Sequence, residues 1–291
     1  MDNKIEFKKL REFGEVINDT FEFIKQNIKP LLKVFAYFCG FFLLATMIAA
    51  ISQQISMYQN MLSPSQNPYA FFQQAFSWSG VILIIFYYLS YVSLNVSILC
   101  YISLYVEKGK VAPTVEQVWS YLKYFFLRAM GGTFLISIFF IFCLACCVIP
   151  GIYVFPAVSL FLSVMIFENG SLSYSFSRAF KLLKDQWWIT AATLVVLYII
   201  TYACTLFVSM PAMVINMASM VTQGGNVGPG IISIIITNVI QYVCQVFMII
   251  PLIGSSLVYF NLAERAGNTG LFDRINELGE KKPDFNKDEQ Y

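Results

Sequence analysis

Residues 150–188 read PGIYVFPAVSLFLSVMIFENGSLSYSFSRAFKLLKDQWW, and this stretch decides the fold. An apolar run at 152–167 is followed by a polar segment and a pair of tryptophans. In the polar segment, apolar side chains recur at helical steps of four, four, three and four residues. They are Leu172, Phe176, Phe180, Leu183 and Trp187. Arg178, Lys181 and Asp185 lie on the other face. The segment therefore predicts an amphipathic helix in the membrane interface, with the tryptophans marking the start of the next span.

The composition of the whole chain is that of a membrane protein. Of its 291 residues, 58% are hydrophobic and 12% are charged, whereas soluble domains have about 25% charged residues. The net charge of +2 argues against a nucleic-acid partner. The chain has no histidine, which excludes histidine-dependent zinc, iron and Ser–His chemistry. We therefore predict no catalytic residue, no metal site and no cofactor.

The seven cysteines all fall within apolar runs. A C-x-x-C pattern occurs in CLACC (143–147), but no histidine or carboxylate accompanies it to complete a zinc site. Cysteine is also a small polarizable residue that packs well between helices. We favour this packing role over metal binding.

Six apolar stretches approach or exceed the length of about 20 residues that crosses a bilayer. They are 31–51, 78–105, 129–149, 152–167, 187–210 and 230–263. The sequence VIPGIYVFP predicts a tight turn at Pro150–Gly151 between the third and fourth spans. Pro251 predicts a kink in the sixth span.

The charged residues occupy four segments only: an N-terminal arm, 107–128, 168–185 and the tail from Glu264. In a chain of six spans, these segments all lie on one side of the membrane. Their lysines and arginines predict that this side is cytoplasmic. We expect a multi-pass protein of the inner (plasma) membrane of a bacterium, with both termini in the cytoplasm.

Two further segments repeat the pattern of an amphipathic helix before a span. In the first, apolar residues recur at helical steps from Leu10 to Leu31, and Pro30 is expected to end the helix before the first span. The second, 114–128, opens with a capping-box pattern formed by Thr114 and Gln117. Ser171 is the expected N-cap of the third.

The predicted fold is all-α. It consists of six transmembrane helices arranged as three hairpins, each preceded by an amphipathic interfacial helix on the cytoplasmic side. The domain organisation is an N-terminal amphipathic arm (1–30), a six-helix transmembrane domain (31–263) and a polar cytoplasmic tail (264–291).

One candidate contact site lies at the predicted cytoplasmic face. Glu168 and five basic residues would bind anionic lipid headgroups or a protein partner there. The basic residues are Lys123, Arg128, Arg178, Lys181 and Lys184. The structural alternative is that Glu168 pairs with a basic neighbour, and that the basic residues only set the topology.

A second candidate site is a polar track in the sixth span. Asn238, Gln241 and Gln245 recur at steps of three and four, which places them on one helix face. They would line the path of a solute, or they would form hydrogen bonds between packed helices. A continuous polar cavity along this face would favour transport, and a bundle filled with side chains would favour a scaffold.

The stretch 150–188 resembles the bacterial six-span family named for the membrane domain of glycerophosphodiester phosphodiesterases, and its Yip1-like relatives. The likeness lies in the Pro-Gly turn, the span that ends in Glu168, the serine-rich helix and the tryptophan-containing entry to the next span. The resemblance implies the membrane module alone. The catalytic barrel of such enzymes needs about 250 residues with acidic metal ligands and histidines, and this chain has no room for it.

These observations lead to two hypotheses about function. The first is a non-enzymatic membrane protein, a scaffold or accessory factor that acts through membrane lipids and a protein partner. The alternative is a transporter or channel for a small or lipid-like solute that uses the polar face of the sixth span. Residues 34–106, 129–167 and 186–263 contain no Lys, Arg, Asp or Glu, and this absence of ionisable carboxylates and basic residues argues against proton coupling.

Overall fold

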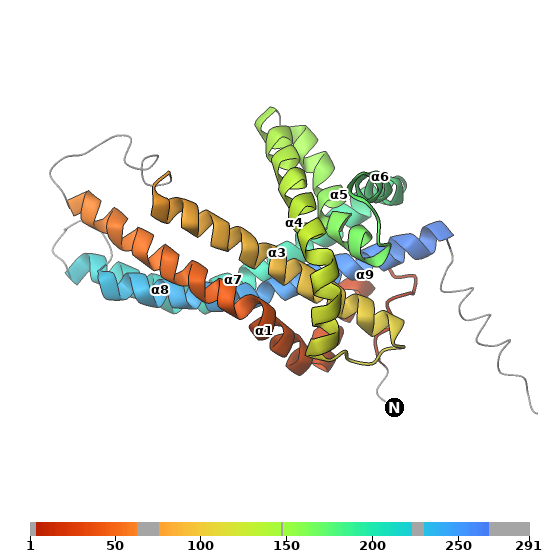
Figure 1. Cartoon of the computed structure of the whole chain (residues 1–291), viewed down its shortest axis with the longest axis horizontal. Helices are drawn as coiled ribbons and strands as arrows, with labels where there is room; N and C mark the ends of the chain where they lie inside the picture. Colours follow the sequence, from red (N-terminus) through yellow and green to blue (C-terminus); the bar gives the residue numbers. More distant parts are fainter. Residues whose placement is uncertain (1–3, 63–75, 147, 223–229, 268–291) are drawn as a thin grey trace, which may run out of the picture.

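The computed structural model describes residues 4–62, 76–146, 148–222 and 230–267, and its regular elements there are all helices. The helices are listed here in chain order with the labels of Figure 1: α1 (Phe13–Leu62), α3 (Trp78–Glu107), α4 (Val115–Cys146), α5 (Val148–Phe167), α6 (Leu172–Leu183), α7 (Trp187–Thr222), α8 (Ile231–Val243), the 3₁₀ helix η1 (Cys244–Met248) and α9 (Ile249–Gly267). The predicted tail lies outside the described residues from position 268 onward.

Six helices of the described chain are long and apolar enough to cross a membrane: α1, α3, α4, α5, α7 and the continuous run of α8, η1 and α9. The chain is therefore an all-α, multi-pass integral membrane protein, as its sequence predicts. An α-helix places every backbone N–H and C=O in hydrogen bonds within one segment, so it can cross hydrocarbon without unpaired backbone groups.

Most of the helices form one elongated body, which we call the long lobe (α1, α3, α7, α8, η1 and α9). Within it, α1 packs against α3, α8 and α9, and α7 packs against α8 and α9. The α4–α5 hairpin points away from the axis of this lobe (Figure 1). The core lies where the two parts meet, and its most deeply buried side chains include Phe23, Leu31, Tyr101, Leu160 and Ile253.

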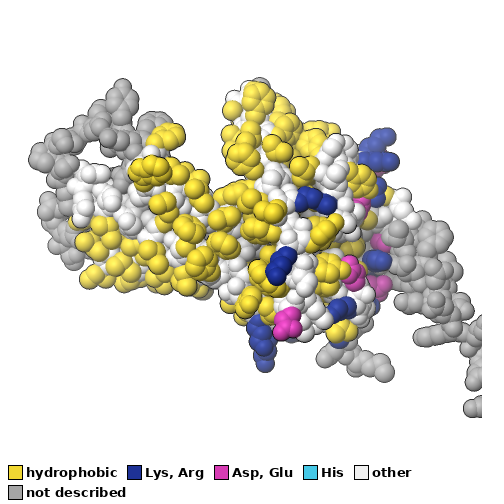
Figure 2. Space-filling model, viewed as in Figure 1, with side chains coloured by type: hydrophobic (Ala, Val, Ile, Leu, Met, Phe, Trp, Pro, Cys, Tyr) yellow, Lys and Arg dark blue, Asp and Glu magenta, His cyan; other side chains and the backbone are white. Residues whose placement is uncertain are grey.

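The charged side chains gather at one end of the molecule, which we call the charged end. It carries Arg11, Lys110, Glu168, Arg178 and Arg265. Figure 2 shows the blue and magenta side chains at this end, whereas the rest of the long lobe and the tip of the α4–α5 hairpin are yellow in this view.

The predicted helix break at Pro30 is wrong. Pro30 lies inside α1, which runs without interruption from the amphipathic segment into the first span. Contacts on both sides of the proline stabilise the continuous helix. Phe23 and Leu31 are fully buried, and the amide of Asn27 is bonded to the carbonyl of Phe23 and to the hydroxyl of Tyr101. Tertiary packing therefore offsets the backbone hydrogen bond that a proline removes.

The second predicted interfacial helix is also continuous with its span, because α4 begins at Val115 and ends at Cys146. Its capping box is confirmed. The backbone N–H of Thr114 donates to Gln117 Oε1 over 3.0 Å, and Gln117 N–H donates back to Thr114 Oγ1 over 3.5 Å. Of the three predicted segments, only 171–188 forms a separate helix, α6, and its N-cap Ser171 accepts from Tyr174 N–H over 3.3 Å.

The tight connection between α4 and α5 is confirmed, but its position differs from the prediction. The helices are separated by residue 147 alone, so Pro150 and Gly151 lie in the first turn of α5. Proline is tolerated there because the first N–H groups of a helix need no intrahelical acceptor. A Cβ atom at Gly151 would lie 2.2 Å from Leu144 Cδ2, so a larger residue there would displace the side chain of Leu144.

Candidate functional site

A cavity of about 330 Å³ lies between α3 and α7, deep in the apolar part of the long lobe. We call it the tyrosine groove. Its walls are Tyr87, Tyr91, Leu94 and Asn95 of α3 and Tyr198, Thr201, Tyr202 and Thr205 of α7. Its floor is Gln241, Cys244, Gln245, Met248, Pro251 and Leu252. Tyr87 and Tyr202 are more than half exposed, so the groove opens sideways at the surface of the lobe.

An interruption in the sixth span forms the floor of the groove. The helix changes from α to 3₁₀ at Cys244 and returns to α at Ile249, shortly before Pro251. The pyrrolidine ring of Pro251 would clash with the carbonyl of residue 247 in a regular α-helix, and it has no N–H to donate to it. The kink predicted at Pro251 stays a prediction; the structure shows a 3₁₀ segment that ends at Met248, three residues before the proline.

The three residues of the predicted polar track divide between two environments. Asn238 is 1% exposed and does not line the groove. Its amide donates to Gln54 Oε1 of α1 over 3.0 Å and to the carbonyl of Ile234 over 2.8 Å. Asn238 therefore joins helices, which is the structural alternative, and only Gln241 and Gln245 face the groove.

Gln241 and Gln245 form no side-chain hydrogen bond anywhere in the described chain. Three other polar side chains of the groove donate hydrogen bonds to their own helices. Asn95 Nδ2 donates to the carbonyl of Tyr91 over 2.8 Å, and Thr201 and Thr205 donate to the carbonyls four residues earlier. The two carboxamides are thus the free polar groups on the floor of the groove.

At the charged end, Glu168 accepts hydrogen bonds on both carboxylate oxygens. Arg178 Nε lies 3.0 Å from Oε1 and 3.2 Å from Oε2, Tyr259 donates to Oε1 over 2.9 Å, and Tyr174 donates to Oε2 over 2.5 Å. The hydrogen bond to the carboxylate raises the pKa of Tyr174, because it stabilises the protonated phenol, and desolvation adds to the effect. Glu168 therefore connects the end of α5 to α6 and α9.

The candidate basic residues do not converge on one point. Arg128 donates to Asn169 Oδ1 over 3.0 Å and to the Gly170 carbonyl over 2.5 Å, so it holds the α5–α6 connection. Lys123 lies over the ring of Trp119 at 4.8 Å. Lys181 and Lys184 are exposed, and within the described chain neither forms a salt bridge.

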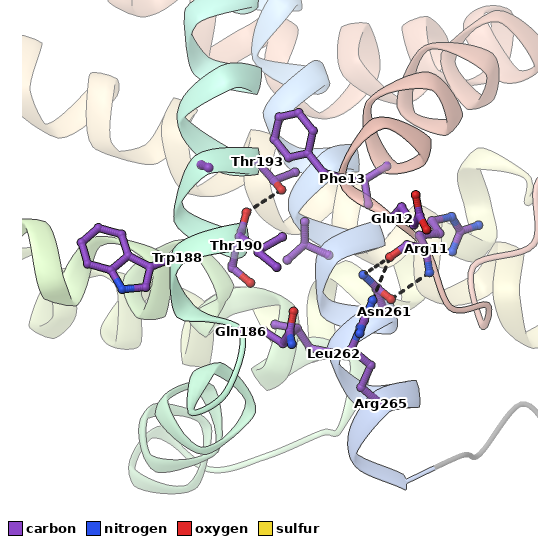
Figure 3. A pocket seen from close by; sticks show the side chains of 14 residues that line it. Arg11, Glu12, Phe13, Gln186, Trp188, Thr190, Thr193, Asn261, Leu262 and Arg265 are labelled. Atoms are coloured by element: carbon purple, nitrogen blue, oxygen red, sulfur yellow. Dashed lines mark hydrogen bonds between the residues drawn. The ribbon is translucent and has the colours of Figure 1, made fainter.

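A second cavity, of about 470 Å³, lies at the charged end between the N-terminal arm, the start of α7 and the end of α9. Figure 3 shows Arg11 and Glu12 facing Asn261 and Arg265, with Gln186, which precedes α7, and Thr190 and Thr193 of α7 on the opposite side. Asn261 bonds to both the N–H and the C=O of Arg11, at 2.9 and 3.0 Å. The Arg11 guanidinium is itself bound by Asp19 at 2.8 Å and by the carbonyls of Glu6, Phe7 and Lys9.

The sequence did not reveal either cavity, and it did not single out Arg11 or Asn261. Each cavity is lined by segments far apart in the chain, and no local spacing pattern connects such segments. Within the described residues no three His, Cys, Asp or Glu side chains come close enough to hold a metal ion. Cys147 of the CLACC motif lies outside the described residues.

No family model matches the chain, and neither a curated protein nor a solved structure is significantly similar to it.

Proposed function

We propose that this integral membrane protein is a non-enzymatic accessory factor that binds a lipid-like molecule in the tyrosine groove. The observation that carries the proposal is the pair of unpartnered carboxamides of Gln241 and Gln245, which lie in a stretch without charged residues. An amide without a hydrogen-bond partner in an apolar medium costs about 2–7 kcal/mol, depending on the reference state. A ligand that supplies a donor and an acceptor at this depth would offset that cost.

The size of the groove favours a small molecule over a helix of another protein. Ligand sites commonly enclose about 300–1,000 Å³ and are mainly apolar, with a few polar groups that fix the orientation. The tyrosine groove has about 330 Å³ and fits this description. Close packing of a partner helix usually needs small residues along the seam, whereas the walls here carry four tyrosines. The expected ligand has an apolar body and one group that both donates and accepts hydrogen bonds.

The orientation and the lipid contacts at the charged end belong to the same proposal. The basic residues there support a cytoplasmic location of this end in a bacterial inner membrane, by the positive-inside rule. Lys181 and Lys184 are exposed and are the best placed for anionic headgroups. Glu168 and Arg178 are occupied by each other, so we assign them a structural role. The resemblance of 150–188 to the glycerophosphodiester phosphodiesterase membrane-domain family supports the role of a membrane module.

The test is to purify the protein in mild detergent and identify by mass spectrometry the small molecules that remain bound. We expect one lipid-like species to be enriched with the wild-type protein and reduced at least about tenfold by Gln241→Leu with Gln245→Leu, because both hydrogen bonds are lost. Gln59→Leu, an exposed glutamine of α1 outside the groove, is the matched control. If the double variant retained as much of the lipid-like species as the wild type, the proposal would be contradicted. Proteins that co-purify in the same experiment would identify a partner.

A second candidate function is transport of a lipid-like solute. The interrupted helix under the groove favours it, because many transporters bind their substrate at broken helices near the middle of the membrane. Against it, the polar track does not form a continuous cavity in the described chain, since Asn238 is buried and bonded to Gln54. Flux of the co-purified molecule across sealed proteoliposomes separates the two functions: an accessory factor binds it without moving it.

A further inference from the structure

Length and composition make α4 and α5 candidate spans, but their contacts place them close to the charged end. The start of α7 shows at which depth, relative to the membrane, the charged end lies. The first residues of α7, together with Gln186, line the same cavity as Arg11, Glu12 and Arg265 (Figure 3). The start of α7 is therefore at the level of the charged residues, on the side from which α7 enters the membrane.

Trp187, the first residue of α7, is in direct contact with Tyr153 of α5. The indole N–H donates to the carbonyl of Tyr153 over 3.0 Å, and the two rings stack with centroids 5.6 Å apart and planes 15° apart. Phe180, near the end of α6, also lies against Tyr153, with ring centroids 6.4 Å apart. Tyr153 is thus fixed at the level where α7 begins.

The tip of the hairpin cannot be far from that level. Tyr153 is the sixth residue of α5, which begins at Val148. At 1.5 Å per residue, five residues along a helix span roughly 8 Å, whereas the hydrocarbon core of a bilayer is about 30 Å thick. A hairpin whose tip lies this close to the charged end cannot reach the opposite surface.

The charges next to Trp187 lead to the same conclusion. Lys184 and Asp185 come three and two residues before Trp187 and are exposed. If the hairpin crossed the bilayer, Tyr153 would lie near the far surface and would bring these two charges into the membrane with it. Charged side chains within the hydrocarbon are costly and rare.

The surface of the hairpin still requires an apolar environment. Residues 129–167 contain no Lys, Arg, Asp or Glu. Its exposed apolar side chains include Phe134, Ile141, Phe142, Val148, Ile149 and Ile152, with exposures from 55 to 79%. Soluble proteins rarely expose an apolar patch of this kind. In Figure 2 the tip is mainly yellow, with white atoms between and no blue or magenta ones.

We infer that the α4–α5 hairpin is inserted into only one leaflet of the bilayer, the leaflet at the charged end, and that its partner is the acyl chains of that leaflet. The long lobe then provides four passes, through α1, α3, α7 and the α8–η1–α9 run. The charge distribution agrees with four passes as well as with six, because the segments before and after the hairpin stay on the same side. This inference does not depend on the tyrosine groove.

A hairpin in one leaflet gives the protein a means of recognising membrane shape. It adds volume to one leaflet and none to the other, so it is accommodated best where that leaflet is stretched on the outside of a curve. Binding of such shallow apolar elements depends on curvature. The protein is expected to be enriched in tubules drawn from giant vesicles when the charged end faces outward.

Accessibility of single cysteines to a membrane-impermeant maleimide tests the inference. The seven native cysteines are replaced, and one cysteine is introduced at Ile149 near the tip, at Ile231 at the start of α8, or at Lys184. All three positions are exposed, so the substitutions disturb little packing. In sealed vesicles, Lys184→Cys and Ile231→Cys identify the two sides. We expect Ile149→Cys to be labelled from the Ile231 side at least about tenfold more slowly than Ile231→Cys, because the tip stays within one leaflet.

Equal labelling of Ile149→Cys and Ile231→Cys from that side would overturn the inference, because it would mean that the hairpin crosses. A fluorophore on Ile149→Cys gives a second measurement. Quenching by spin-labelled lipid placed only in the leaflet next to Lys184 supports insertion in that leaflet. Quenching only from the opposite leaflet contradicts it.

Discussion

The network around Glu168 and the tyrosine groove differ in how their polar groups are satisfied. Both oxygens of Glu168 accept hydrogen bonds, from Arg178, Tyr174 and Tyr259. In the groove, Gln241 and Gln245 form none within the described chain. A buried polar group with all its partners stabilises one arrangement of helices, whereas the polar groups of the groove are free to bind the ligand that we propose. The first site is the more conspicuous in the sequence, but the second is the better candidate for function.

The largest expected effect is at Arg11, the most completely bonded charge of the charged end. Arg11→Met should lower the free energy of unfolding by about 3–5 kcal/mol, because it leaves Asp19 and three backbone carbonyls without their partner. Lys9→Met removes only an exposed pair with Glu15 at 3.8 Å and should change stability by less than about 0.5 kcal/mol. Thermal unfolding in detergent compares the two, and equal effects would show that Arg11 is not a structural centre.

Glu168→Gln should have the next largest effect. The amide keeps the shape of the carboxylate but loses its charge, so the bonds from Arg178 and two tyrosines weaken, by about 1.5–3 kcal/mol in total. If Glu168 instead serves a ligand, the variant would unfold like the wild type and lose only lipid or partner binding. Thermal unfolding and lipid co-purification on the same sample separate these outcomes.

Variants of the polar track test directly whether bonded and unbonded polar groups contribute differently to stability. Asn238→Leu should destabilise the protein by about 1–3 kcal/mol, because the buried side chain of Asn238 loses its hydrogen bonds to Gln54 and to the carbonyl of Ile234. Gln241→Leu and Gln245→Leu should leave the stability of the ligand-free protein unchanged or raise it, because they remove polar groups that have no partner. Chemical or thermal unfolding after delipidation measures all three. Destabilisation by the two groove variants would mean that their amides serve packing, as Asn238 does.

The smallest effect is the pH dependence of Tyr174. The hydrogen bond to Glu168 raises the pKa of Tyr174 in the folded protein. The contribution of this hydrogen bond to the free energy of unfolding is therefore complete below the ordinary phenol pKa of about 10. The contribution is lost as pH rises through the higher folded pKa, because the phenolate cannot donate to a carboxylate. Wild-type protein should therefore be slightly more stable than Tyr174→Phe at pH 9, and the difference should shrink toward pH 11. A difference that is constant with pH would exclude this hydrogen bond as the cause.

The local elements of the fold were well predicted where the deciding interactions are local. The capping box of Thr114 and Gln117 and the N-cap Ser171 involve neighbours three residues apart, and both are confirmed. Pro30 shows the limit of such signals. A proline favours the end of a helix, but the packing of Phe23 and Leu31 in the core keeps α1 continuous through it.

The candidate site was only partly predictable, because contacts between distant segments decide which of its polar residues are bonded. The spacing of Asn238, Gln241 and Gln245 predicted one shared face of the sixth span, but Asn238 bonds to Gln54 and only the two glutamines face the groove. The walls of the groove come from α3 and α7, about 100 residues apart in the chain. No pattern within one segment could have shown that Tyr91 and Tyr202 line the same cavity.

The sequence by itself determined the class of the protein and the number of its apolar helices, because hydrophobicity over about 20 residues is a sum of independent local terms. It also determined that the charges lie at one end. The tertiary structure decided which polar residues are bonded and which are free, and it brought Trp187 against Tyr153. These depend on contacts between distant segments, which decide where a polar group finds a partner and how deep a helix can lie.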